Sequence, residues 1–371
     1  MRLALRELLR RPGRFVAATA VLTAVAVLLM FLGALLDGLL SASTGAYRAQ
    51  RADVIVYSAD AGASLPRSRI TADVRSAIDA APGVAETGGL GSVQLGARPE
   101  PEPDRRDLIA TALIGYELAP SGLPDQPPPP GEVIADDSIE QEGVTIGDVL
   151  LLGPARTPVT VTGFVRDTQY SGQATLWASL DTWREVAGAN RPAQALGDGT
   201  VQAVVVRTDG DPTELAGAIE AAADNRVEAL TLADAIDELP GVSQQRSTFN
   251  QIIGVTAVVA MVVVALFFTL ITVERTGLYG VLKAIGASSR TLFLGVAAQA
   301  AVLALVATAL GVVASLALAA VIPPGSIPFQ VTPSRLVTSG ALMLAAAVIG
   351  CVFSLRRVLR IDPAAAIGGS P

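Results

Sequence analysis

The chain has 371 residues, of which 51% are hydrophobic and 16% are charged, and its formal net charge is −7 at pH 7. Histidine is absent, which excludes a Ser-His-Asp triad and the usual histidine ligation of zinc or haem iron. Cys351 is the one cysteine, so no disulfide can form within the chain.

The N-terminal region predicts a membrane anchor. Residues 1–13 alternate leucine with arginine, a pattern typical of a short amphipathic helix at a membrane interface. The run from Phe15 to Leu36 has 22 residues without a charge, and about 20 apolar residues span a bilayer as a helix. Ser41-Ala42-Ser43 resembles a signal-peptide cleavage site, but the apolar core of a signal peptide usually has only about 7–15 residues. We therefore expect a retained transmembrane helix within residues 1–40.

Residues 41–248 differ in charge from the rest of the chain. They hold 30 acidic and 15 basic side chains, whereas the rest holds 4 acidic and 12 basic ones. Runs rich in Val, Ile and Thr predict strands at residues 52–57, 108–115, 158–165 and 201–207. Apolar periodicity predicts helices at residues 71–81, 180–186, 212–223 and 231–239, and proline-rich stretches predict loops at residues 99–107 and 127–130. This order predicts a large α+β domain and leaves open a division into two lobes near residues 120–131.

Three further apolar runs follow this domain. They cover about residues 249–273, 291–322 and 336–355, and each is long enough to cross a membrane. Pro323-Pro324-Gly325 predicts a short turn between the last two runs. We therefore expect an α-helical membrane protein with four transmembrane helices and a large α+β extracytoplasmic domain between helices 1 and 2. The corresponding segments are residues 1–40, 41–248 and 249–371.

Basic residues gather at one end of the apolar runs. The three groups lie within residues 2–14, 275–290 and 356–360. The positive-inside rule places all three groups and both termini in the cytoplasm, and it places residues 41–248 outside. The expected location is the cytoplasmic (inner) membrane, crossed several times and in contact with lipid. Because each basic group adjoins a span rather than forming a basic domain, the pattern argues against a nucleic-acid partner.

Residues 274–290, ERTGLYGVLKAIGASSR, form a charged island between two apolar runs. Apolar residues recur at helical spacing within it, at Leu278, Val281, Leu282 and Ile285. A short helix here therefore has one apolar face, and burial of that face against the protein's own span ends is one interpretation. A turn this short has no core to fill, so we expect the face to dock on a cytoplasmic partner. The residues expected in this contact are Leu278, Tyr279, Leu282, Lys283, Ile285 and Arg290.

Two motifs give the chain a family resemblance. Residues 280–288, GVLKAIGAS, are similar to a segment that follows the second span in permease subunits of ABC transporters of the MacB/FtsX type. Residues 360–367, RIDPAAAI, are similar to the end of those subunits. The chain departs from the family at Leu278, where many members carry glutamate. The order of one span, a large outer domain and three spans also resembles this family, and residues 52–59 resemble its HrtB- and DevC-like subgroup.

The resemblance implies the permease subunit of an ATP-driven exporter or extractor. The island would then be a coupling helix seated on a separate ABC ATPase subunit, present in two copies. ATP and magnesium would bind to that partner, and no cofactor would bind to this chain. The residues agree that this chain is not the ATPase, because Lys283 is its only lysine and Ala284 follows it, which rules out a P-loop.

A homodimer is the expected working unit. One copy offers four spans, which are few for enclosing a path, and two-fold pairing is the commonest symmetric assembly. Helices 1 and 2 are the best interface candidates because each connects directly to the outer domain.

The substrate implied by the subgroup is amphiphilic, either haem or a lipid-like compound. Asp37 lies near the outer end of the first span, where an acidic group is either functional or already at the wet interface. Gly33 and Gly38 would open space beside it. Without histidine, a tyrosine, a methionine or a carboxylate would have to bind the haem iron, and Asp37, Met30 and Tyr47 are the nearest choices. The residues expected near the substrate are Asp37, Tyr47, Arg48, Arg51, Phe249, Asn250 and Met30.

Two other function classes stay open. A non-transporting signal transmitter, in which ATP binding inside moves the outer domain to regulate a partner, fits the same resemblance. A membrane-anchored enzyme would need a catalytic site within residues 41–248, where Asp136 and Asp137 form an acidic pair. Adjacent residues on a strand point to opposite faces, so a solvated acidic surface accounts for this pair better.

Overall fold

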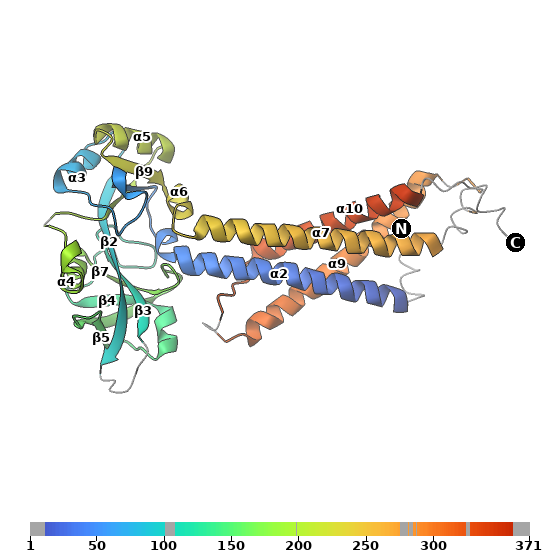
Figure 1. Ribbon diagram of the computed structural model, residues 1–371, viewed down its shortest axis with the longest axis horizontal. Helices are drawn as coiled ribbons and strands as arrows, with labels where there is room; N and C mark the ends of the chain where they lie inside the picture. Colours follow the sequence, from blue (N-terminus) through green and yellow to red (C-terminus); the bar gives the residue numbers. More distant parts are fainter. Residues whose placement is uncertain are drawn as a thin grey trace. The chain divides into compact units, whose positions relative to one another are not determined.

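The computed structural model describes residues 12–100, 108–197, 199–274, 281, 285–286, 288–323 and 327–358. The chain divides into two compact units, whose elements are labelled in Figure 1. The helical unit consists of the described residues of Met1–Gly38 and Arg246–Pro371, and the sheet domain is Leu39–Gln245. The boundary falls inside helix α2 (Pro12–Arg48) and inside helix α7 (Val242–Glu274), so the chain continues from one unit to the other within these two helices.

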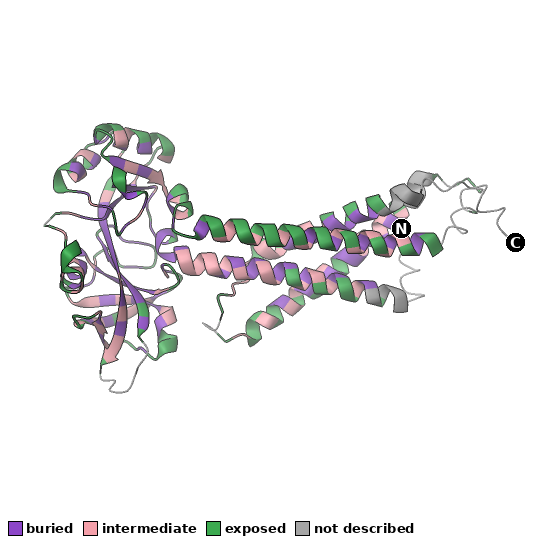
Figure 2. Cartoon of the chain, in the orientation of Figure 1, coloured by how far each residue is buried: buried purple, intermediate pink, exposed green. Residues whose placement is uncertain are grey.

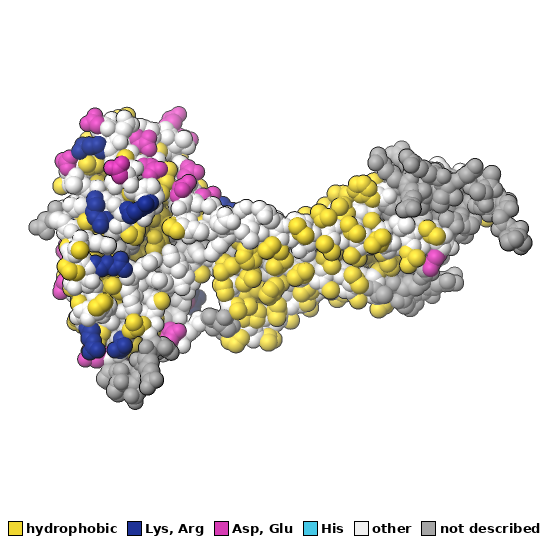
Figure 3. Space-filling model, in the orientation of Figure 1, with side chains coloured by type: hydrophobic (Ala, Val, Ile, Leu, Met, Phe, Trp, Pro, Cys, Tyr) yellow, Lys and Arg dark blue, Asp and Glu magenta, His cyan; other side chains and the backbone are white. Residues whose placement is uncertain are grey.

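Four helices in the described part of the chain are long and apolar enough to cross a membrane: α2, α7, α9 (Ser289–Val321) and α10 (Pro333–Val358). Their most apolar stretches have mean hydropathies between 2.3 and 2.7, as expected for residues that face lipid. Figure 3 shows hydrophobic side chains over the visible face of this unit. The fold class expected from the sequence is confirmed, because four candidate spans are present and a mixed α+β domain lies between the first and the second.

The first helix is longer than the sequence predicts. The uncharged run predicts an end near Leu36, but α2 continues to Arg48. Side chains support the extra turns: Thr44 Oγ1 donates to the carbonyl oxygen of Leu40 at 2.6 Å, and Arg48 Nε donates to Thr44 Oγ1 at 3.1 Å. An uncharged run shows which part of a helix can lie within the membrane. The helix itself can continue beyond that run.

Small residues let the helices of this unit approach closely. A Cβ added at Gly311 on α9 would lie 3.0 Å from the Cβ of Ala26 on α2, and a Cβ added at Gly340 on α10 would lie 3.0 Å from Cγ2 of Thr308 on α9. Membrane helices associate through such close packing because lipid tails are as apolar as the side chains. The buried core of the unit includes Leu22, Ala26, Leu29, Phe268, Ala304, Ala307, Met343 and Ala347.

The described strands of the second unit form one nine-stranded sheet, in the order β3-β7-β4-β6-β5-β2-β8-β1-β9. They are β1 (Val54–Ser58), β2 (Glu86–Glu100), β3 (Ile109–Tyr116), β4 (Glu132–Asp136), β5 (Val149–Leu152), β6 (Thr157–Val165), β7 (Ala174–Ser179), β8 (Ala203–Arg207) and β9 (Val227–Thr231). Strand β2 also pairs with β3, so the strands from β3 to β2 close into a ring. The first part of β2 pairs with β8, which makes β2 the strand shared by the ring and by the β8-β1-β9 extension.

Alternating side chains of the sheet enter two hydrophobic cores. Val54 and Val56 of β1 lie in one core, and Ile55 and Tyr57 lie in the other, as the two-residue period of a strand requires. The first core is covered by helices α3 (Ala72–Asp79), α4 (Leu180–Asn190) and α5 (Pro212–Ala222), and the second contacts α6 (Leu232–Asp237). Short 3₁₀ helices lie at η1 (Ala59–Ala61), η2 (Asp137–Glu142) and η3 (Pro192–Gln194). Figure 2 shows the buried residues concentrated in the strands and exposed residues on the helices that cover them.

The local patterns located about half of the strands. The predicted strands coincide with β1, β3, β6 and β8, and the predicted helices coincide with α3, α4, α5 and α6. Strands β2, β4, β5, β7 and β9 were not predicted. The loop predicted at residues 99–107 is wrong at its start, because Pro99 and Glu100 end β2 and pair with β5. Residues 101–107 lie outside the described residues. No division near residues 120–131 is seen within the described part, where the strands share one sheet.

Candidate functional site

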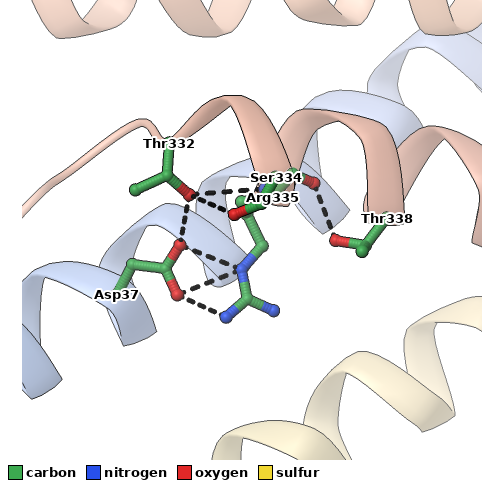
Figure 4. A network of polar contacts seen from close by, with 5 residues as sticks. All are labelled: Asp37, Thr332, Ser334, Arg335 and Thr338. Atoms are coloured by element: carbon green, nitrogen blue, oxygen red, sulfur yellow. Dashed lines mark hydrogen bonds and ion pairs between the residues drawn. The ribbon is translucent and has the colours of Figure 1, made fainter.

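A charged network joins α2 to the start of α10 in the helical unit (Figure 4). Thr332 precedes Pro333, the first residue of α10, and Thr332 Oγ1 accepts a hydrogen bond from the backbone N–H of Arg335 at 3.3 Å. Threonine followed by proline is a favourable helix start, because the hydroxyl satisfies a free N–H and proline has no donor to satisfy. This start holds Arg335 in the first turn of α10, beside Asp37 of α2.

Arg335 and Asp37 form a forked ion pair. Arg335 Nε donates to both carboxylate oxygens of Asp37 at 3.1 Å, and Nη2 pairs with Oδ1. Thr332 Oγ1 donates to Oδ2 at 2.9 Å. The Arg335 and Asp37 side chains are 25% and 17% exposed, so their charges are more desolvated, and more dependent on each other, than those of a surface pair. Arg335 Nη1 has no hydrogen bond among the described residues.

Two glycines of α2 make room for the network. A Cβ at Gly33 would lie 2.5 Å from Cδ of Arg335, and a Cβ at Gly38 would lie 2.8 Å from the backbone nitrogen of Phe329. The sequence predicts open space beside Asp37 at these glycines. That expectation is corrected by the structure, because the Arg335 side chain and the backbone near Phe329 occupy the space.

Gly38→Val is expected to lower the thermal stability of the protein. The new side chain would collide with the backbone of Pro328, which cannot move by changing rotamer, and overpacking of this kind costs about 1–3 kcal/mol. The melting temperature of the detergent-solubilised protein measures the effect, and a fall of several degrees is expected. Gly254→Val on α7 is the matched control, because a Cβ there meets nothing within 4 Å. Equal melting temperatures for the two variants would contradict the proposed close approach.

The other residues expected near the substrate are spread over both units. In the helical unit, Met30 is buried, Phe249 is half-buried and Asn250 is exposed. In the sheet domain, Arg48 and Arg51 are exposed. None of these residues is among the described hydrogen-bond partners of the Asp37 carboxylate, which are Arg335 and Thr332. Their grouping around one substrate stays a prediction.

Tyr47 lies in the core of the sheet domain. Tyr57 Oη donates to Tyr47 Oη at 3.0 Å, and the Tyr47 ring stacks on Tyr170 with ring centroids 5.9 Å apart. Burial raises the pKa of Tyr57 well above its usual value. Because the Tyr47 side chain is buried, a role in substrate binding would require it to become accessible.

Most of the residues expected in the coupling contact lie outside the described residues. These are Leu278, Tyr279, Leu282, Lys283 and the side chain of Arg290. Ile285 is described and is 78% exposed, and Val281 is 56% exposed. The Ile285 N–H donates to the Val281 carbonyl oxygen at 3.0 Å. The described part of this segment thus presents two exposed apolar side chains, and their docking on a partner stays a prediction.

An acidic cavity of about 280 Å³ lies in the sheet domain, lined in part by Asp136 and Asp137. The Asp136 carboxylate is buried and accepts hydrogen bonds from the backbone N–H groups of Ser138 at 3.1 Å and Thr168 at 2.8 Å. Burial and the neighbouring Asp136 carboxylate raise the pKa of Asp137. No cluster of three His, Cys, Asp or Glu side chains in the described part of the chain could hold a metal ion. These hydrogen bonds to backbone N–H groups give the Asp136 carboxylate a structural role in the domain.

Arg335 is the site residue that sequence reasoning missed. It ends an uncharged run that begins at Thr291, and it stands at the opposite end of a span from the basic groups. A basic residue at the outer end of a span is an exception to the positive-inside rule, so a nearby interaction must stabilise it there. Pairing with an acidic group near a span end is one such interaction. Asp37 was the available partner, and the two signals together would have identified the pair.

Comparison with known proteins gives matches over parts of the chain. Residues 250–363 match the family described as FtsX-like permease C-terminal. An uncharacterized ABC transporter permease of Mycobacterium bovis is 28% identical over 66% of this chain and 63% of its own length. A Staphylococcus epidermidis protein named as a hemin transport system permease, HrtB, is 27% identical over 30% of this chain and 32% of its own length. The chain therefore aligns with less than two thirds of the length of each of these relatives.

The periplasmic region of MacB from Actinobacillus actinomycetemcomitans is a structural neighbour. Its structure aligns with 50% of this chain and 92% of its own chain, at a TM-score of 0.35 and 10% sequence identity.

Proposed function

Because this chain carries an FtsX-like permease domain, we propose that it is the permease subunit of an ATP-driven exporter or extractor. The match to residues 250–363 carries this proposal, since it takes in most of α7, the charged island, α9 and α10. The chain is a multi-pass membrane protein, and its relatives are ABC transporter permeases.

ATP hydrolysis is assigned to a partner. ABC permeases work with an ATPase, and the absence of a P-loop in this sequence supports a separate subunit. We place the contact at residues 274–290, supported by the exposure of Val281 and Ile285. Two copies of the ATPase, with both termini and this segment in the cytoplasm, complete the proposed arrangement.

The substrate we propose is an acidic amphiphile, and haem and lipid-like acids both have this chemistry. The support is the Asp37–Arg335 pair, which places a guanidinium group among apolar helices with Nη1 free of a described hydrogen bond. A ligand carboxylate or phosphate would bind Arg335 by taking the place of Asp37. The name of the staphylococcal relative favours haem as one candidate.

A homodimer remains the proposed assembly, with α2 and α7 at its interface. An exposed apolar row along α7 supports it, because its members recur at helical spacing and either lipid or a second copy must cover them. The row comprises Val255, Val258, Val262, Leu266, Leu270 and Val273.

Reconstitution tests the function. The chain and its ATPase would be placed in lipid vesicles that contain either haem or a fluorescent fatty acid, and ATP-dependent loss of the compound from the membrane would be followed. Loss that requires both proteins and ATP is expected, and native mass spectrometry of the same preparation should give two permease and two ATPase copies. ATP hydrolysis without movement of either compound would contradict export and favour the signal-transmitter alternative.

A further inference from the structure

A small cavity in the sheet domain presents an unusual set of side chains. It has a volume of about 40 Å³, enough for a few water molecules, and it is bordered by α4, β2 and the residues just before β8. The lining residues that matter here are Arg69, Arg184, Arg191, Trp183, Ser92 and Gln202. All of the lining residues belong to the sheet domain.

Three arginines meet at this cavity, and no carboxylate side chain lines it among the described residues. Arg69 Nη1 donates to the carbonyl oxygen of Ser68 at 2.7 Å, and Arg191 Nη2 donates to that of Gln94 at 2.8 Å. Neither guanidinium has an ion pair in the described part of the domain, whereas Arg184 pairs with the exposed Asp181 at 3.1 Å.

The other described arginines of the domain are of two kinds: some pair with carboxylates, and some, such as Arg67 and Arg156, have no ion pair among the described residues. Among the paired arginines, Arg75 binds Glu117 and Arg226 binds Asp73. Residues 41–248 also hold twice as many acidic as basic side chains, so acidic partners are abundant. What distinguishes this cavity is that three arginines share it while no carboxylate is among its described lining residues. Figure 3 shows basic side chains on the face of this domain where Figure 1 places α4.

Three residues that line the cavity carry donors without a hydrogen-bond partner among the described residues. Gln202 is 7% exposed, and its Oε1 accepts from the Ser92 backbone N–H at 2.6 Å, which fixes the orientation of the amide. The amide nitrogen of Gln202 is left without a hydrogen bond among the described residues. Nε1 of Trp183 and Nε of Arg184 are also buried without a partner.

We propose that this cavity binds an oxyanion, the carboxylate or phosphate group of a ligand whose remainder lies outside. An oxyanion supplies only acceptors and negative charge, which matches a lining that supplies donors and positive charge. The volume admits a group of a few heavy atoms and no more. This binding site goes beyond the proposed transport function and does not depend on it.

Tryptophan fluorescence of the full-length protein in detergent tests the proposal. The chain has two tryptophans, and Trp183 lines the cavity. Titration with inorganic phosphate, and separately with acetate, would be done at constant ionic strength maintained with sodium chloride. A saturable change is expected with at least one anion, and it should be lost in Trp183→Phe. Saturation by phosphate alone identifies a phosphate site, and saturation by both identifies a general oxyanion site.

The variant Arg69→Gln/Arg191→Gln is expected to weaken binding at least about tenfold, because it removes two charge-assisted donors. Arg67→Gln is the matched control: Arg67 is exposed, makes one long hydrogen bond to the Gly62 carbonyl oxygen at 3.5 Å, and should leave binding unchanged. If the double variant fails to fold, the single variant Arg191→Gln at an exposed position serves the same purpose. No saturable change with either anion, or equal binding by the wild type and the arginine variants, would overturn the proposal.

Discussion

Ile285→Asp is expected to lower permease-stimulated ATP hydrolysis at least about tenfold. A tenfold loss of partner binding corresponds to about 1.4 kcal/mol, and burying an unpaired carboxylate in an apolar contact costs more than that. Ile285 is the most suitable position because its side chain is 78% exposed and it belongs to the segment that we assign to the ATPase contact. The ATPase rate would be measured in vesicles with and without the permease.

Ile285→Leu is the matched control for that experiment. It keeps an apolar side chain of equal size, so stimulation should remain close to that of the wild type. The amount of each variant in the membrane must be measured, since a loss of insertion would also lower the rate. Full stimulation by correctly inserted Ile285→Asp would show that the ATPase contact lies elsewhere.

Removing either partner of the Asp37–Arg335 pair is expected to destabilise the helical unit strongly. Breaking a fully buried pair costs about 3–5 kcal/mol and a surface pair about 0–1 kcal/mol, so this partly buried pair should fall between them. Thermal melting in detergent would compare Asp37→Ala, Arg335→Ala and the double variant. The double variant should be destabilised by less than the sum of the two single changes, because the second change removes a charge that the first left unpaired.

Charge exchange sharpens this test. Asp37→Arg alone places two guanidinium groups together and should be the least stable variant, whereas Asp37→Arg combined with Arg335→Asp should regain part of the loss. Strict additivity of the two alanine changes would contradict the coupling that the forked geometry implies. The same variants in the vesicle assay would report whether Arg335 or Asp37 serves the substrate.

The membrane part of the fold follows from composition because its physical cause is local. A long uncharged apolar run is more stable as a helix in lipid than in water, and this preference does not depend on the rest of the chain. The paired charges at its edge do not follow in the same way. Asp37 was visible as an acid near a span, but Arg335 lies far along the sequence, and only folding brings the two together.

Strand β2 shows why half of the sheet escaped prediction. It contains several glycines, which disfavour a strand when judged locally. In the structure, packing explains one of these glycines and a glycine on the neighbouring strand. A Cβ at Gly91 on β2 would lie 2.6 Å from Cδ2 of Trp183, and a Cβ at Gly115 on β3 would lie 2.6 Å from Cβ of Trp183. The indole of α4 rests on two strands whose residues must be small there. Such a requirement comes from a distant part of the chain and leaves no periodic pattern in the strand itself.

The first and last strands of the sheet domain are neighbours. Strands β1 and β9 pair in antiparallel fashion, and the Leu232 N–H donates to the Asp53 carbonyl oxygen at 2.9 Å. The polypeptide therefore enters and leaves this domain side by side, as an insertion with adjacent ends. An insertion of this kind can be grafted, exchanged or enlarged as a block during evolution, because the host chain needs only two neighbouring attachment points.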